Sequence, residues 1–111
     1  MNTLELEGAA LDWAVQQCEG TRKDIDFAWW TEDYTPSTNW AQGGPIIERE
    51  KIDLRFDDEW MALKYGIDYE LEEMPDEYPF GPTPLIAAMR CYVASKLGYT
   101  VDVPKEIDAK V

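Results

Sequence analysis

The sequence predicts a small α+β domain, in which one mainly antiparallel sheet of three or four strands is packed by two helices. Two apolar patterns with helical spacing, near opposite ends of the chain, predict the helices. Short stretches of alternating polarity lie between them, without the strand–helix alternation typical of parallel sheets. The 111 residues are 45% apolar and 13% aromatic, which is enough for the core of a single domain over residues 1–111.

The first predicted helix is the segment GAALDWAVQQC. Ala10, Trp13, Ala14 and Cys18 follow the i, i+3, i+4 rhythm of an amphipathic helix. Gly20 follows them and is a typical left-handed stop, so we expect the helix to end there.

The second predicted helix is the segment GPTPLIAAMRCYVASKLG, which carries the clearest local signals in the chain. Thr83 is a good N-cap, Pro84 suits the first helical position, and Gly98 suits the stop. Arg90 is predicted to project from this helix into solvent. The apolar stripe is predicted to consist of Leu85, Ala88, Met89, Tyr92 and Val93.

Alternating polarity predicts the strands. Residues 24–30 and 46–54 fit a period of two, the second with a bend near Lys51. Residues 59–66 fit a strand or a short helical turn, and residues 99–104 fit a short strand or an extended arm. The polar residues 31–45 are predicted to form a loop.

Two segments are predicted to lie outside the packed domain. Residues 56–80 are rich in acids, with nine Asp and Glu against Lys64 alone between positions 57 and 77, and are predicted to form a solvated loop or lid. Residues 104–111 follow a proline and are highly charged, and we expect a flexible tail there.

The charge balance excludes several classes of function. With 23 acids against 10 bases and a net charge of −13, the surface would repel nucleic acids and anionic membranes. No apolar run approaches the roughly 20 residues of a membrane span, and the start MNTLELEG lacks the features of a signal peptide. We therefore expect a cytoplasmic protein, in which Cys18 and Cys91 are buried, reduced thiols.

The residue types also argue against catalysis. The chain has no His and no clustered Cys, so we expect no metal site, no cofactor and no His-based triad. Glu48 and Glu50 form a conceivable carboxylate pair on one face of the predicted strand, but alternating acids are usually a solvated face. No catalytic residue is predicted, and the protein is expected not to be an enzyme.

The most distinctive stretch of the chain is YTPSTNWAQGGP. Its hydroxyls and amides suit either a well-ordered surface loop or a ligand-binding loop, because they form local turns as readily as they bind a ligand. An aromatic face for stacking and glycines that permit close approach favour the binding loop. The candidate ligand-binding residues in this stretch are Tyr34, Ser37, Thr38, Asn39, Trp40, Gly43, Gly44 and Pro45.

Arg49 and Arg90 complete the candidate site, since arginine binds phosphate in a bidentate manner. The alternative for Arg49 is a salt bridge with Glu48, Glu50 or Asp53, and such exposed pairs stabilise little. Five tryptophans are many for this length. Two or three would fill the core and the others would line a pocket or a subunit interface, so a homo-oligomer is predicted.

Three segments resemble the NinX-like proteins of tailed phages and prophages: GAALDWAV, the stretch from YTPSTNW to GGPIIERE, and the GPTPLIAAMRCYVASKLG helix. The similarity covers about two thirds of the chain and does not extend to residues 56–78. It implies a phage or prophage origin, action in the host bacterial cytoplasm, and a role as an accessory or host-interaction factor. The family carries no assigned activity.

Two functions follow as hypotheses. The first is a non-enzymatic phage accessory protein that binds and sequesters a small, nucleotide-type host defence signal. The second is an acidic inhibitor or nucleic-acid mimic that occupies a host defence protein. Because the polar loop belongs to the family-like part of the chain and the acidic segment does not, the first hypothesis is preferred.

Overall fold

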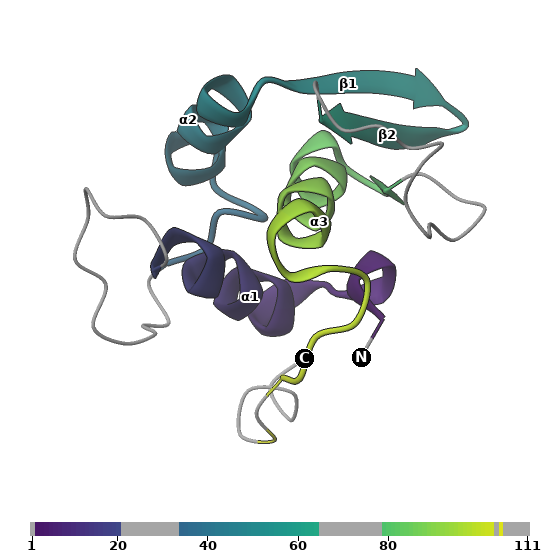
Figure 1. Ribbon diagram of the computed structural model, residues 1–111. Coiled ribbons are helices and arrows are strands. Elements are labelled where there is room, and N and C mark those ends of the chain that lie inside the picture. Colours follow the sequence, from purple (N-terminus) through teal and green to yellow (C-terminus); the bar gives the residue numbers. More distant parts are fainter. Residues whose placement is uncertain (1, 21–33, 65–78, 104, 106–111) are drawn as a thin grey trace.

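A computed structural model describes residues 2–20, 34–64, 79–103 and 105 of the chain (Figure 1). It contains helices on both sides of a central helix and a small sheet above it. The elements are η1 (Thr3–Glu5), α1 (Gly8–Gly20), α2 (Trp40–Glu50), β1 (Ile52–Asp57), β2 (Glu59–Lys64), β3 (Phe80–Gly81) and α3 (Pro84–Leu97).

The sheet has three antiparallel strands in the order β1-β2-β3. β1 and β2 form a hairpin in which Phe56 lies opposite Trp60, and β2 pairs Met61 with Phe80 of β3. The predicted α+β class is therefore confirmed. The described part of the chain holds three α-helices where two were predicted.

Helix α3 is the centre of the molecule. It packs against α1 on one side and against the sheet on the other, with α2 beside it (Figure 1). The predicted start is confirmed, because the Thr83 hydroxyl accepts a hydrogen bond from the Ile86 amide at 3.1 Å and Pro84 is the first helical residue. The predicted stop at Gly98 is confirmed as well, with a φ of 85° that suits glycine.

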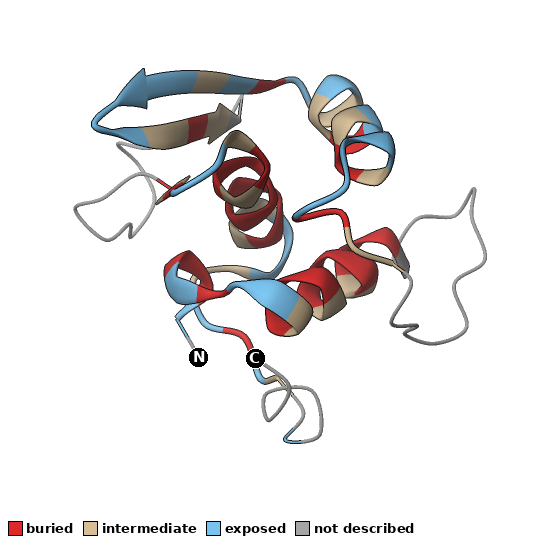
Figure 2. Ribbon diagram, turned by 180° about the vertical axis from the view of Figure 1, so that it is seen from behind, coloured by how far each residue is buried: buried red, intermediate tan, exposed pale blue. Residues whose placement is uncertain are grey.

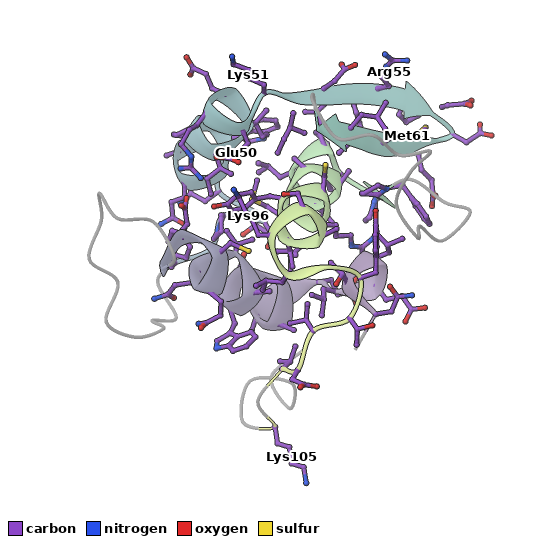
Figure 3. The ribbon with its side chains drawn as sticks, in the orientation of Figure 1. Glu50, Lys51, Arg55, Met61, Lys96 and Lys105 are labelled. Carbon is purple, nitrogen blue, oxygen red and sulfur yellow. The ribbon has the colours of Figure 1, made fainter. Side chains whose placement is uncertain are left out.

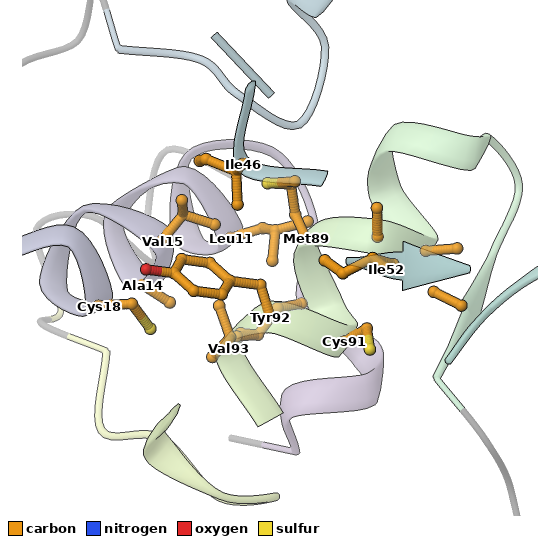
Figure 4. Close-up of a cluster of buried hydrophobic side chains, with 14 of the residues drawn as sticks. Leu11, Ala14, Val15, Cys18, Ile46, Ile52, Met89, Cys91, Tyr92 and Val93 are labelled. Carbon is orange, nitrogen blue, oxygen red and sulfur yellow. The ribbon is translucent and has the colours of Figure 1, made fainter. Parts of the chain in front are cut away.

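The core forms where α1, α2 and β1 meet α3. Figure 4 shows the Tyr92 ring between side chains of α1, with Ile46 of α2 and Ile52 of β1 closing the cluster. Figure 2 shows the same distribution, since α1 and α3 are mostly buried and the hairpin is mostly exposed. Cys18 and Cys91 are buried in this core as thiols that form no disulfide, which confirms that prediction.

Helix α2 contradicts the secondary structure predicted for its sequence. Residues 40–45 belong to a helix and not to a loop, and residues 46–50 continue that helix instead of forming a strand. Asn39 caps the helix by accepting from the Ala41 amide at 2.9 Å, and Lys51 ends it in the left-handed conformation with a φ of 55°. Pro45 lies within the helix on its exposed side.

The position of the Arg90 side chain also differs from the prediction. The side chain was predicted to reach solvent, but it is buried in α3. Its Nε donates to the Leu6 carbonyl at 2.7 Å and its Nη1 donates to the Phe80 carbonyl at 2.7 Å. Arg90 thus joins the N-terminal segment to β3 through two backbone carbonyl oxygens.

The acidic segment 56–80 contains the end of β1, all of β2 and the start of β3. The strand predicted within 59–66 is therefore confirmed over Glu59–Lys64. At the C-terminal end, Thr100 forms one antiparallel bridge with Asn2, and residues 101–103 continue without regular secondary structure. The strand predicted at 24–30, residues 65–78 and most of the predicted tail lie outside the described residues.

No helix in the described ranges combines the length and apolar character that a bilayer crossing requires.

Candidate ligand-binding site

The polar stretch before α2 is a turn attached to α1. The Ser37 amide donates to Oδ1 of Asp12 at 2.9 Å, and the Thr38 and Asn39 amides both donate to the Thr35 carbonyl. The Thr35 amide in turn donates to Oε1 of Gln42 at 2.6 Å. These bonds fix the turn and determine where α2 begins.

Gly43 brings α2 against the turn and against α3. A Cβ atom at this position would collide with the Pro36 carbonyl oxygen and would lie 2.7 Å from Cδ2 of Leu85. Only glycine permits this approach. Gly44, the next residue, has no such restriction, because its Cβ atom would meet only the Trp40 ring at 3.8 Å.

An open pocket of about 220 Å³ lies where this turn meets the start of α3. The first residue of α2 and the first turn of α3 both border it, so two helix N-termini with their partial positive charge adjoin one pocket. Trp40 forms part of the lining and is 55% exposed. The lining residues are Ser37, Thr38, Trp40, Thr83, Pro84, Leu85 and Ile86.

A buried polar pair lies beneath the pocket. Ser37 is buried, and its hydroxyl lies beside the Asp12 carboxyl without the geometry of a hydrogen bond. Burial raises the pKa of Asp12, and the interactions with Ser37 offset part of that rise. Ser37 lines the pocket, but its hydroxyl oxygen is itself buried and has no hydrogen-bond partner within the described structure.

The structure brings part of the predicted site together. Ser37, Thr38 and Trp40 line the pocket. Asn39 does not, because its side chain caps α2. The remaining candidates of this stretch lie on the adjoining turn and helix and outside the lining: Tyr34, Gly43, Gly44 and Pro45.

Arg49 lies in a separate network at the other end of α2. Its Nη1 and Nη2 bind both carboxylate oxygens of Glu19 at 3.1 Å, and Nη2 also donates to the Tyr92 hydroxyl at 3.0 Å. The guanidinium carbon stands 5.5 Å from the centre of the Tyr92 ring, which adds a cation–π contact. The Tyr92 hydroxyl donates to Glu19 at 3.3 Å, so each of the three side chains is hydrogen-bonded to the other two.

Glu50 extends this network. It accepts from Nε of Arg49 at 2.8 Å and lies 3.8 Å from Nζ of Lys96, and Figure 3 shows Glu50 and Lys96 facing each other between α2 and α3. Partial burial would lower the pKa of Arg49, but the hydrogen bonds to Glu50 and Glu19 raise it above its ordinary value. The arrangement fits the salt-bridge alternative. Glu48 is exposed and lies on a helix, so the strand-face carboxylate pair with Glu50 does not form.

The sequence analysis missed the contribution of α3 to the pocket. In the sequence, Thr83 and Pro84 indicate only the start of a helix. A helix N-terminus beside a candidate ligand-binding turn is, however, a typical binding site for anionic groups. Asp12 was also missed; its signal was an acid within an apolar helical pattern. Within the described ranges, no three Cys, Asp or Glu side chains gather as a metal site would require.

The described residues therefore form a small α+β protein with an open pocket at the start of its central helix. The sequence profile of the family described as Bacteriophage P22, NinX matches residues 2–96, and the chain belongs to this family. The matched range includes the acidic segment that the three similar motifs left out. No curated protein matches the chain.

Proposed function

We propose that this NinX-like phage protein is a non-enzymatic accessory factor that binds a small nucleotide-type molecule in the pocket at the start of α2 and α3. In this proposal it acts in the host bacterial cytoplasm, and its ligand is a signal of host defence that it sequesters. A homo-oligomer remains part of the proposal, because exposed apolar side chains outside the pocket lining, such as Leu97, suit an interface.

The observation that supports the proposal is the exposed indole of Trp40 at the rim of the pocket. A tryptophan residue that is 55% exposed provides a flat aromatic face on which a base can stack. Thr38 lies exposed in the same lining, and its hydroxyl can donate to or accept from the edge of that base.

The size of the pocket limits what it can enclose. At about 220 Å³ it is smaller than the roughly 300–1,000 Å³ of pockets that bury drug-sized ligands. One ring fits, and the rest of the ligand extends into solvent. Arg49 and Arg90 do not line the pocket, so a phosphate would depend on the helix N-termini.

A thermal-shift panel of nucleosides, nucleoside monophosphates and cyclic nucleotides tests the proposal. A ligand at a hundredfold excess over its dissociation constant stabilises the protein by about 2.7 kcal/mol and raises the melting temperature. Trp40→Ala is expected to remove that rise. Thr38→Val keeps the shape of the side chain and is expected to weaken binding by about tenfold, because one hydrogen bond is lost.

Phe56→Ala is the matched control, since Phe56 is another exposed aromatic residue and does not line the pocket. This variant is expected to bind the nucleotide as the wild type does. A panel without any melting shift, or a shift that Trp40→Ala leaves unchanged, contradicts the proposed function.

A further inference from the structure

The β1–β2 hairpin ends in a tight turn whose residues do not line the pocket. Asp57 lies opposite Glu59, and Asp58 makes the turn between them in the left-handed conformation, with a φ of 63°. Phe56 and Trp60 form the next pair inward. We call residues 56–60 the acidic tip.

The two aromatic residues of the acidic tip differ in how much they are buried. Trp60 is half-buried and packs against the core, whereas Phe56 is 64% exposed. Their rings meet edge to face, with centroids 5.3 Å apart and planes at 61°. A cross-strand aromatic pair stabilises a hairpin, but this packing uses only part of the Phe56 ring. The remaining surface of the Phe56 ring faces water, and the ring is held in place by Trp60.

The charge around this ring has one sign. Asp57, Asp58 and Glu59 are all exposed, and among the described residues no ion pair involves them. Arg55 is the nearest cation in β1, but it points away from the sheet in Figure 3 and its Nε and Nη2 both lie 3.0 Å from Oδ2 of Asp53. None of the three carboxylates forms an ion pair within the described ranges, and the Glu59 charge interacts at longer range with the Arg90 guanidinium.

We propose that the acidic tip is a docking surface for a lysine- or arginine-rich segment of another protein. Charge complementarity selects this partner: three carboxylates attract a basic segment and repel nucleic acids and anionic lipids. The exposed Phe56 ring supplies the apolar anchor that a bound segment covers, as aromatic residues do at the centres of small interfaces. Such basic surfaces are typical of proteins that bind nucleic acid.

Fluorescence anisotropy with a labelled synthetic peptide of lysine and leucine residues tests the docking surface. The full-length protein is expected to bind this peptide more weakly as salt increases, and not to bind a glutamate–leucine peptide. Phe56→Ala and the triple variant Asp57→Asn, Asp58→Asn, Glu59→Gln are each expected to weaken binding by about tenfold or more. Asn tolerates the left-handed conformation, so the triple variant preserves the turn.

The matched control neutralises three exposed acids elsewhere, Glu5→Gln, Glu48→Gln and Asp102→Asn, and makes the net charge less negative by the same amount. Its affinity is expected to change by less than about threefold. Equal losses in the two triple variants would show attraction to net charge alone and overturn the proposal, as would the absence of peptide binding. Phe56→Thr replaces Phe56→Ala if the hairpin unfolds, because threonine favours strands.

The two proposals fail independently. Trp40→Ala is expected to lose nucleotide binding and to keep peptide binding, and Phe56→Ala is expected to do the reverse.

Discussion

At the scale of single residues, the Glu19–Arg49–Tyr92 network connects three helices. Glu19 comes from α1, Arg49 from α2 and Tyr92 from α3, and the side chain of Glu19 is only 5% exposed. A carboxylate that is so little exposed to solvent requires a positively charged or hydrogen-bonding partner, since a buried charge without one is strongly unfavourable. Arg49 supplies two parallel hydrogen bonds in the bidentate geometry that carboxylates prefer.

Arg49→Ala is expected to lower the free energy of unfolding by about 2–4 kcal/mol, because Glu19 and the Tyr92 hydroxyl would lose their common donor. The value is below that of a fully buried pair since Arg49 is 29% exposed. Urea denaturation measures the change.

The double variant Glu19→Leu, Arg49→Met is the control for this effect. Apolar residues leave no charge without a partner, so stability is expected to recover most of the loss. If the single and double variants are equally unstable, the loss comes from packing and the ionic account is contradicted.

At the scale of elements, the position of α2 determines the shape of the pocket. Its N-terminus, capped by Asn39, places Trp40 at the rim, and Gly43 lets the helix approach the first turn of α3. The helix forms although two glycines and a proline oppose it, because packing of Ile46 in the core outweighs local propensity.

Gly43→Ala and Gly44→Ala are adjacent substitutions with opposite expected effects. At position 43 the added methyl collides with the Pro36 carbonyl and Leu85, and a loss of about 1–3 kcal/mol is expected. At position 44 the methyl has room, and the gain in helix propensity is expected to raise stability by about 0.5–1 kcal/mol. Chemical denaturation of both variants measures the difference; equal effects would contradict the close approach of α2 and α3.

The elements also show how far the sequence predicts this fold. Helix α3 was predictable because its cap, its first-turn proline and its glycine stop all agree along one segment. Helix α2 was not, since the alternation over residues 46–54 imitates a strand and Pro45 suggests a break. The cap at Asn39 was the available signal. Three pocket residues were predictable from their chemistry, but the contribution of Thr83 and its neighbours depends on a tertiary contact that spacing does not reveal.

At the scale of the whole molecule, stability is expected to depend on alkaline pH. Burial, with the Glu19 charge adding to it, raises the pKa of Cys18 from 9.0 to about 12, and burial raises the pKa of Tyr34 and Tyr92 as well. These groups hold their protons in the native state at pH values where the unfolded chain has lost them. The contribution of Cys18 is therefore complete below about pH 9 and is lost as the pH rises through about 12, and that of the two tyrosines, whose ordinary pKa is 10.0, is lost at higher pH.

Urea denaturation across this range is expected to show stability falling by about 1.4 kcal/mol per pH unit for each such group. Cys18→Ala is expected to make the first part of the decline less steep. A free energy of unfolding that stays constant from pH 9 to about 12 would contradict the burial of these protons.

The oligomeric state is a further property of the whole molecule, and a homo-oligomer stays a prediction. Trp40, Phe56 and Leu97 are the large apolar side chains left exposed in the described structure. Light scattering is expected to give a mass above that of the 12.8 kDa chain. A monomer at micromolar concentration would contradict this prediction.

Backbone amide NMR during titration with a nucleotide tests the ligand pocket most directly, and the chain is small enough for complete spectra. The account predicts saturable shifts at the amides of Ser37, Thr38 and Leu85 and at the amide and indole N–H of Trp40, with the acidic tip unchanged. Spectra that stay unchanged for every nucleotide of the panel, or shifts confined to the hairpin, would contradict a ligand-binding pocket between α2 and α3.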